Sequence, residues 1–427
     1  MKKIYSAAGA VLAVAAVFLS VTPLRLQAAL EIEAGPLAEL VREAYQTSPT
    51  LRAAHARWQA AVERAPQAAS LPDPTVAYGY FVERMNTRQQ FRVEQMFPGW
   101  GKRHLRSAVA QAEAEAAAIA LETTAANVRL EIVEAAINYS LTLESTTRTT
   151  EALQLTESLM EVAGQSYRTG GNSQIDLLLI EAEVESLRSE LIGWRERETS
   201  DRAWVNAIIG RPAETPLPGL EELPALGAMP DVRPDELRQQ LLHNPDLREA
   251  QAQIRVAEQA HKLARSQSRP DLMLGVEYMD NRDNAPDEVM GMVSINLPLW
   301  RGKYRAERRE AAANLRAAQS NYTSRLNQTE SEIWRALYAA RDAHRRAQLY
   351  TDSLVPRATQ TLSLVEADYQ TGLATFKDLL DAQRALLDLE LDRAQAQADA
   401  FLRTAQWERL IATHPDLFNA LSSTAAQ

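Results

Sequence analysis

The sequence of 427 residues contains no cysteine, and this absence removes several classes of site at once. Without a thiol the chain has no disulfide, no thiolate metal ligand, no cysteine nucleophile and no N-terminal cysteine for lipid attachment. Positive charge is also in deficit, because 46 lysines and arginines face 56 aspartates and glutamates, for a net charge of −10. We therefore expect no nucleic-acid partner, since phosphate binding needs clustered lysine and arginine.

Patterns that would indicate catalysis or metal binding are missing as well. The sequence has no glycine-rich phosphate loop and no serine nucleophile motif, and its six histidines lack ligand spacing. We therefore predict no catalytic residues, no cofactor, no metal ligands and no enzymatic activity. The scattered histidines are His55, His104, His243, His261, His344 and His414.

Long hydrophobic runs are limited to the N-terminus, where an apolar stretch extends from Ile4 to Val21. Lys2 and Lys3 precede this stretch, Pro23 ends it, and small residues for cleavage follow. The pattern predicts a secretory signal peptide over residues 1–29, with a retained membrane anchor as the alternative. A secreted mature chain would then be soluble in the periplasm or built into the outer membrane with strands.

What the sequence does contain is an internal duplication, visible as matching motifs about 200 residues apart. Their separation grows from 196 to 202 residues along the chain, as small loop insertions would cause. We predict a first repeat over residues 30–210, a proline-rich linker over 211–234, and a second repeat with a short C-terminal tail over 235–427. The matches are Ser48-Pro49-Thr50-Leu51 with Asn244-Pro245-Asp246-Leu247, Pro98-Gly99-Trp100 with Pro298-Leu299-Trp300, Gly101-Lys102 with Gly302-Lys303, and Tyr167 to Leu178 with Tyr369 to Leu380.

Each half is predicted to contain a helical run, two strands, a very long helical run and a final helix. A run of about 65 helical residues spans roughly 95 Å, which suits a helical wall and not a globular domain. The first and last helices could stack end to end along the long one. The expected helices are 37–70, 102–166 and 173–209, then 235–268, 303–370 and 375–411, and the expected strands are 75–82, 89–97, 272–279 and 289–297.

The strands have the length and alternation of membrane-spanning strands. Each has about eight or nine residues, near the ~9–11 that cross a bilayer when tilted. Leu272, Leu274, Val276 and Tyr278 share one face of the third strand. Four strands cannot close a barrel, but three copies would supply twelve. The alternative is a four-stranded sheet in a soluble domain.

The duplicated order of elements, together with two motifs, resembles the TolC family of outer-membrane efflux proteins. The motifs are the paired Tyr-x-x-Gly-x-x-Ser/Thr-x-x-Asp-Leu-Leu stretches and the exit from the first hairpin, residues 97–103. That exit, with residues 71–74 before the hairpin, is similar to members that serve heavy-metal efflux pumps. The resemblance implies a mainly α fold in which long antiparallel helical hairpins form an α-barrel, and in which each chain adds four strands to a 12-stranded trimeric transmembrane β-barrel.

The resemblance also implies a function and partners. A homotrimer in the outer membrane, in contact with lipid, would be the passive exit duct of a tripartite efflux or type I secretion system. It would dock to a periplasmic adaptor (membrane fusion) protein and an inner-membrane transporter. The alternative is a soluble periplasmic coiled-coil adaptor or scaffold.

Gate residues follow from the same resemblance. It implies that Asp378 and Asp381 line the periplasmic constriction, where three copies would give rings of carboxylates that favour cations. Asp176 is the remaining acid in the first repeat, and Tyr369 matches a family tyrosine that helps to hold the closed state. A family arginine that shares this task falls at Ala374, so the closing network must differ. From the residues alone, the aspartates could instead stabilise a helix N-terminus.

Two further sets complete the candidate site. Gly170, Gly171 and Gly372 would allow tight turns at the helix tips, and Ser173 and Thr375 would be N-caps. The resemblance implies that these five residues also dock the adaptor. Trp100 and Trp300 leave the two hairpins at equivalent positions and suit an interfacial aromatic belt, with ordinary packing as the alternative.

Overall fold

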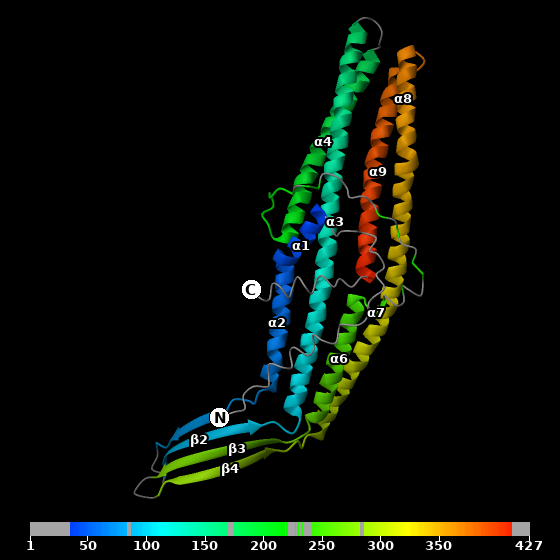
Figure 1. Cartoon of the computed structure of the whole chain (residues 1–427). Helices are drawn as coiled ribbons and strands as arrows, with labels where there is room; N and C mark the ends of the chain where they lie inside the picture. Colours follow the sequence, from blue (N-terminus) through cyan, green and yellow to red (C-terminus); the bar gives the residue numbers. More distant parts are fainter. Residues whose placement is uncertain are drawn as a thin grey trace.

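The computed structural model describes residues 35–82, 87–168, 174–217, 241–281 and 286–411, with residues 219, 220, 227, 229, 232, 233 and 237 between them. These residues form a long bundle of nearly parallel helices with a small sheet at one end (Figure 1). The predicted signal peptide, part of the predicted linker and the C-terminal tail lie outside the described residues. The architecture is mainly α with a small β part, as predicted.

The same order of elements occurs in both halves of the chain. The first half contains α1 (Pro36–Thr47), α2 (Pro49–Ala69), β1 (Thr75–Tyr80), β2 (Thr87–Phe97), α3 (Lys102–Arg168) and α4 (Gln174–Ile209). The second half contains α6 (Pro245–Ser266), β3 (Asp271–Asn281), β4 (Glu288–Asn296), α7 (Arg301–Leu349), the π-helical turn η1 (Tyr350–Leu354), α8 (Val355–Thr371) and α9 (Phe376–Ile411).

The first helical run of each half is interrupted, so our prediction of helical runs over 37–70 and 235–268 was wrong at Ser48 and at Leu242 to Asn244. Ser48 separates α1 from α2 with a ψ of 124°, and Asn244 precedes α6 with a ψ of 127°. In both places the next residue is proline, Pro49 or Pro245, which disfavours the helical conformation for the residue before it. The repeated Ser/Asn-Pro motif is therefore a helix break.

Each break lies where the final helix of the same half ends. The Thr47 hydroxyl donates a hydrogen bond to the carbonyl oxygen of Ile209, the last residue of α4, at 2.8 Å. The Asn244 side-chain amide donates to the carbonyl oxygen of Leu410, near the end of α9, also at 2.8 Å. These contacts satisfy carbonyls that a helix end leaves free. The short helices thereby follow one another along α3 and along α7, as predicted.

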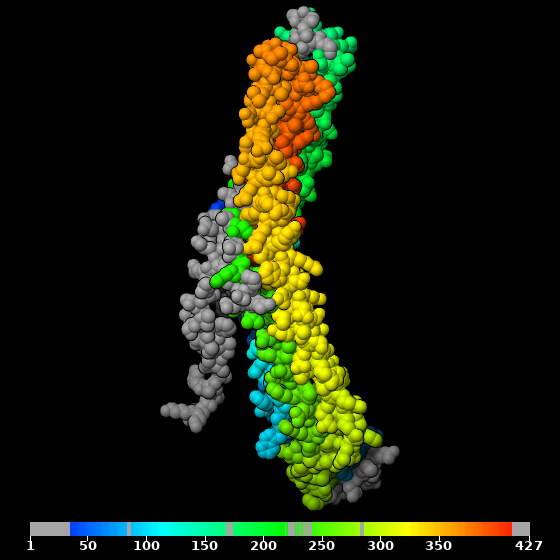
Figure 2. Space-filling model, turned by 90° about the vertical axis from the view of Figure 1, so that its right-hand side faces the viewer, coloured from blue at the N-terminus to red at the C-terminus, as the bar shows by residue number. Residues whose placement is uncertain are grey.

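The long helical run of the second half is continuous, as the yellow-green to orange run along the molecule in Figure 2 shows, but it contains one π-helical turn. At this turn the Val355 N–H donates to the Tyr350 carbonyl, five residues back, and Pro356 follows within the first turn of α8. The motif separation rises from 201 residues at Lys303 to 202 at Tyr369, a span with no loop in either half. The extra residue is therefore taken up by the π turn, and our attribution of this step to a loop insertion was wrong.

The four strands form one antiparallel sheet in the order β1-β2-β3-β4. The central β2–β3 pairing joins the two halves of the chain, for example through Val93 opposite Val276. The outer edges of β1 and β4 have no strand partner among the described residues. The sheet lies at the end of the helical bundle and is directed away from it (Figure 1).

The main core lies in the middle of the bundle, where α1, α3, α4 and α9 meet. Small side chains are frequent there, and Ala125, Ala135, Ala394 and Ala398 are fully buried. Small residues let helices approach closely, which gives a thin wall of helices. None of the described helices combines the length and apolar character that a membrane crossing requires.

Candidate functional site

The sheet has one apolar and one polar face, because opposed residues of antiparallel strands point to the same side. Val76, Val93, Val276 and Val293 share the apolar face and are 50–74% exposed. Tyr78, Phe91 and Tyr278 lie in a row on the same face, with ring centroids 4.9 and 6.5 Å apart. No described element covers this face, which is unfavourable in water and favourable in a bilayer.

The polar face carries a cross-strand ion pair. Arg92 on β2 lies 3.0 Å from Glu277 on β3, and Glu277 is only 3% exposed. Glu94 lies 3.8 Å from the same arginine. A sheet with charges on one side and valines on the other can separate lipid from water.

The two predicted interface tryptophans are free of contacts that would bury them. Trp100 is 94% exposed and Trp300 is 79% exposed. Both lie where a strand of the sheet leads into a long helix. Ordinary packing within the chain therefore does not explain them, and their position between the apolar sheet and the helices fits a membrane interface.

The corner between β2 and α3 contains a buried ion pair that the sequence analysis did not identify. Lys102 is 3% exposed, and its Nζ lies 2.8 Å from Asp271 Oδ1 at the start of β3. The Gly99 N–H donates to the same oxygen at 2.7 Å. A side chain at Gly99 would collide with the Pro270 carbonyl oxygen. The repeat of Gly101-Lys102 as Gly302-Lys303 was the only sequence signal for a role of Lys102 that we used, and it did not identify Asp271 as the partner.

At the opposite end of the bundle, Gly372 turns the chain from α8 into α9. It has a φ of 79°, a left-handed conformation that glycine adopts readily. The Leu373 N–H donates to the Asp368 carbonyl at 2.8 Å, which closes the end of α8. The predicted tight turn is thus confirmed at this tip. Gly170, Gly171 and Ser173 of the other tip lie outside the described residues.

Asp378 takes part in a reciprocal cap at the start of α9. Its Oδ2 accepts hydrogen bonds from the Thr375 hydroxyl at 2.6 Å and from the Thr375 N–H at 2.8 Å. In return the Asp378 N–H donates to the Thr375 hydroxyl oxygen at 3.2 Å. These hydrogen bonds from Thr375 lower the pKa of Asp378 below its ordinary value. Helix-end stabilisation, the alternative reading of Asp378, is thus realised in the structure, and the carboxylate remains exposed.

Asp381 lies one turn further along α9 and pairs with Lys377. Both side chains are more than 60% exposed. Sequence reasoning missed Lys377, although its spacing of four residues from Asp381 on a predicted helix was a usable signal. Any ring of carboxylates formed here would therefore include a nearby ring of ammonium groups.

Tyr369 joins the tips of the two repeats. Its ring packs edge-on against Phe376, with centroids 5.9 Å apart. Both belong to a small apolar cluster that also contains Ala163 of α3 and Ile180 of α4. Asp176 lies in the first turn of α4. The structure thus brings together residues of both halves at this end.

A second connection between the repeats was not found from the sequence. Arg384 on α9 lies 3.2 Å from Glu183 and 2.8 Å from Glu190, both on α4. Closer to the core, Arg393 of α9 lies 3.3 Å from Glu144 of α3. These pairs connect α9 to the first-half helices, in a chain that has Ala374 where the family arginine would stand. No local spacing in the sequence could reveal ion pairs between residues 194 to 249 positions apart.

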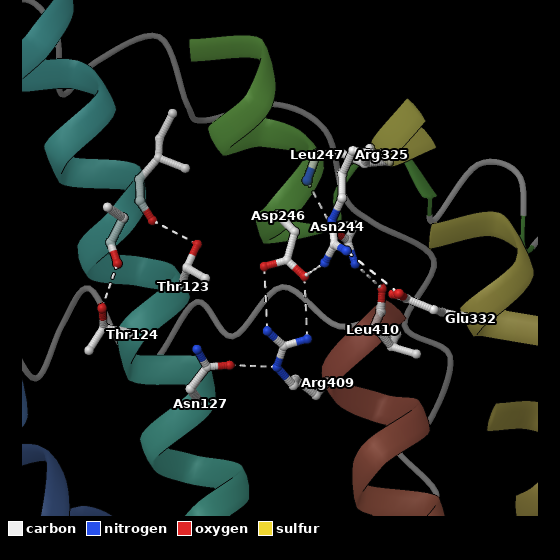
Figure 3. A network of polar contacts seen from close by, with 12 residues as sticks. Thr123, Thr124, Asn127, Asn244, Asp246, Leu247, Arg325, Glu332, Arg409 and Leu410 are labelled. Carbon is white, nitrogen blue, oxygen red and sulfur yellow. Dashed lines mark hydrogen bonds and ion pairs between the residues drawn. The ribbon is translucent and has the colours of Figure 1, made fainter. Parts of the chain in front are cut away.

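A polar network joins four helices at the level of the proline breaks (Figure 3). Asp246 on α6 lies 2.6 Å from Arg325 on α7 and 3.4 Å from Arg409 on α9. Arg409 Nε also donates to Asn127 of α3 at 2.6 Å. Asp246 is mostly buried, at 12% exposure, so its two arginine partners compensate a carboxylate with little access to water.

The described residues contain no group of three or more histidine, cysteine, aspartate or glutamate side chains that could hold a metal ion. His344 is buried and lies 3.0 Å from the Thr404 hydroxyl between α7 and α9. Burial lowers the pKa of His344. This histidine is part of the packing between the two helices.

Comparison with known proteins gives a consistent assignment. Residues 237–412 match the family described as outer membrane efflux protein. The pyoverdine export outer membrane protein OpmQ of Pseudomonas putida is 24% identical over 255 residues, which are 56% of this chain and 51% of that protein. The matched region thus spans about half the length of this relative.

Solved structures agree with the fold. The outer membrane protein VceC of Vibrio cholerae superposes with a TM-score of 0.70 at 23% identity, covering 88% of this chain and 95% of that one. The CmeC outer membrane channel of Campylobacter jejuni gives a TM-score of 0.75 at 13% identity, covering 92% and 90%. The predicted mainly α fold with four strands per chain is confirmed, and these matches support the resemblance to the TolC family that the sequence indicated.

Proposed function

We propose that this chain, whose residues 237–412 match the outer membrane efflux protein family, is the outer-membrane channel of a tripartite efflux or type I secretion system. It is a passive exit duct across the periplasm and the outer membrane. The observation that carries the proposal is the two-faced sheet, whose apolar face is uncovered and whose β1 and β4 edges lack partners among the described residues. Unpaired strand edges are not tolerated in lipid, so other chains must close the sheet.

A homotrimer meets this requirement. Three copies supply twelve strands, an even number that closes into a transmembrane barrel in contact with outer-membrane lipid. The helical walls of the same three copies would enclose the periplasmic tunnel. The relatives named outer-membrane proteins favour this reading over a soluble periplasmic adaptor. The exit from the first hairpin, residues 97–103, is similar to that of family members that serve heavy-metal efflux pumps, so metal ions are one candidate cargo. Drugs and secreted peptides are the alternatives.

The helix tips are the proposed contact with a periplasmic adaptor, which in turn joins an inner-membrane transporter. Apolar side chains are unusually exposed there: Leu373 at 81%, Ile175 at 68% and Leu178 at 57%. These residues flank the predicted docking set of Gly170, Gly171, Ser173, Gly372 and Thr375. Exposed apolar side chains on helix ends fit the packing of a partner's helical hairpin.

The gate is proposed at the same end. Asp378 and Asp381 of three copies form two carboxylate rings, and Lys377 reduces their net negative charge. The apolar cluster of Tyr369 and Phe376 with Ala163 and Ile180 connects the second-half tip to the first half. The ion pairs of Arg384 with Glu183 and Glu190 do the same. Opening requires at least some of these contacts to break, because they connect α8 and α9 to α3 and α4.

Single-channel conductance in a planar bilayer tests both the channel and its gate. We expect a small, cation-selective conductance for the purified protein. Asp378→Ala/Asp381→Ala should lower the cation-to-anion permeability ratio to below one, because Lys377 then leaves the ring with a positive charge. Lys377→Ala should raise the ratio, because it removes the compensating cation.

A matched control removes two exposed carboxylates near the sheet end, Glu258→Ala/Glu310→Ala, and should leave the permeability ratio unchanged. Unchanged selectivity in the Asp378→Ala/Asp381→Ala variant would retain the channel and reject the gate. A correctly folded protein that never conducts in a bilayer would reject the channel itself.

A further inference from the structure

The polar face of the sheet is rich in methionine. Of the nine methionines in the chain, five lie on this face and none on the apolar face of the four strands. Methionine is an ordinary core residue, but two of these side chains are open to solvent, with exposures of 38% for Met96 and 42% for Met290. A packing role alone therefore does not account for the set. The five are Met96, Met273, Met279, Met290 and Met292.

Strand register gathers three of these methionines around one glycine. Met96 of β2 lies directly opposite Met273 of β3. One step along the same face, Gly275 lies between Glu94 of β2 and Met292 of β4. Directly opposed side chains have Cβ atoms about 4.5–5.5 Å apart and diagonal ones about 7–8 Å. Met273 is opposed to Met96 and diagonal to Met292, so its flexible thioether side chain is within reach of both, although Met96 and Met292 lie two strands apart.

Gly275 lies between Glu94 and Met292, and neighbouring side chains pack over its backbone. A Cβ atom at this position would lie 3.1 Å from Glu94 Cγ and 3.3 Å from Met292 Cε. The Glu94 and Met292 side chains therefore both lean over the glycine. The absence of a side chain at residue 275 leaves space into which sulfur atoms and one carboxylate can converge.

Electrostatics of the surroundings favour a cation. Glu94 and Glu277 carry two negative charges, and Arg92, which pairs with both, supplies one positive charge. The next opposed pair along the face, Met290 and Glu277, adds no further cation. A cation held between these side chains would thus meet a net negative charge and uncharged, polarizable sulfur atoms.

We propose that Met96, Met273 and Met292, with Glu94, form a binding site for a soft monovalent metal ion such as Ag(I) or Cu(I). Thioether sulfur is a soft ligand that selects Cu(I)-like ions, whereas Mg²⁺ and Ca²⁺ require oxygen ligands. Three thioethers from three adjacent strands and a carboxylate supply such an ion with a mixed, open coordination shell.

The binding chemistry requires only the sheet, whereas the location of the site inside the channel rests on the proposed function. If the apolar face contacts lipid, this polar face lines the aqueous lumen, and three copies of the site encircle the exit path. Sites in a conduit must bind weakly enough to release. The site would therefore act as a transient stop for a soft metal ion that leaves the cell.

Calorimetric titration of the purified full-length protein in detergent with silver nitrate, in chloride-free buffer, tests the site. We expect saturable binding of one Ag(I) per chain, not matched by K⁺ at the same concentration. Met96→Leu/Met273→Leu, which conserves side-chain volume, should weaken binding at least tenfold. Met279→Leu/Met290→Leu removes the same number of thioethers from the same face and should change the affinity less than twofold.

Absence of Ag(I) binding to the unmodified protein would overturn the site, and so would an equal loss in both double variants, which would mean diffuse binding by exposed sulfur. Conductance of the same preparations separates this proposal from the proposed function. If the protein conducts but does not bind Ag(I), the proposed channel stands and the proposed metal site is rejected. If it binds Ag(I) but never conducts, the metal site stands and the channel is rejected.

Discussion

The two corners that lead from the sheet into the long helices differ, although they have the same origin in the repeat. After β2, Lys102 is buried against Asp271 of the neighbouring strand. After β4, the equivalent Lys303 is exposed and lies 3.8 Å from Glu307 of its own helix, and Leu299, which replaces Gly99, is 74% exposed. The first corner is closed by a segment of its own chain, and the second has no such neighbour among the described residues.

This difference indicates where another copy of the chain must come. The partner of the first corner is the start of β3, which lies next to β2 in the sheet. By the same geometry, the partner of the second corner is the start of a strand beside β4, and the closed barrel that we propose places β1 of a second copy there. In that proposed barrel the open corner would be an interface between two copies, and Leu299 would be one of its contacts.

The largest effect is expected at the closed corner. Gly99→Ala places a methyl group against the backbone of Pro270 and should destabilise the protein by about 3 kcal/mol, the upper range for overpacking. Leu299→Ala should leave the fold of a single chain intact but weaken trimers, because it removes an exposed apolar side chain from the interface. Thermal denaturation and native mass determination in detergent measure the two effects. Equal loss of fold in both variants would contradict the comparison.

A smaller difference is expected at the proline breaks. Asp246→Ala leaves Arg325 and Arg409 without their shared carboxylate and should cost about 2 kcal/mol, below the value for a fully buried pair because the arginines are partly solvated. The equivalent residue of the first repeat is Thr50, which is exposed, and Thr50→Ala should cost less than about 0.5 kcal/mol. Chemical denaturation of each variant, monitored through the far-UV circular dichroism signal of the helices, measures the two costs. Similar costs for both would refute a stabilising role of the Asp246 network.

The smallest effect concerns the loss of stability at acid pH. The second repeat has a buried histidine, His344, at a position where the first repeat has none. His344 stands where the first repeat has Leu143, and burial lowers the pKa of His344. A group with a depressed folded-state pKa contributes stability above its unfolded pKa of about 6.5 and loses it as pH falls. His344→Leu should therefore reduce the decrease in denaturation midpoint between pH 7.5 and pH 5.5. An unchanged decrease would assign the acid sensitivity to other groups.

Much of the fold was accessible from the sequence because it depends on local periodicity. The bounds of α4 and α9 were predicted to within one residue. Serine or threonine before a helix and glycine after it are general sequence signals of helix ends, and here these are Ser173, Thr375 and Gly210. The breaks at Ser48 and Asn244 were missed, although the following prolines were visible, because the apolar pattern continues across them. Local signals thus fix helices well and interruptions less well.

The candidate site was less accessible, for a physical reason. Asp378 and Asp381 were found through a motif, but their actual partners, Thr375 and Lys377, depend on side-chain geometry at one helix end. The Arg384 ion pairs depend on how α9 packs against α4, and the group of Met96, Met273 and Met292 depends on the register of three strands. In both cases the residues come from segments that are far apart in the chain. Such sites become visible only when strands and helices are placed beside each other.

The π-helical turn at Tyr350–Leu354 bears on how two copies of a repeat can diverge. In a regular α-helix one added residue rotates every later side chain by about 100°, which would reorient the whole tip of the second copy. The π turn confines the added residue to a single turn, so the residues after it keep the phase that they had before. A duplicated gene can therefore gain a codon inside a helix that spans most of the molecule and still encode matching tips.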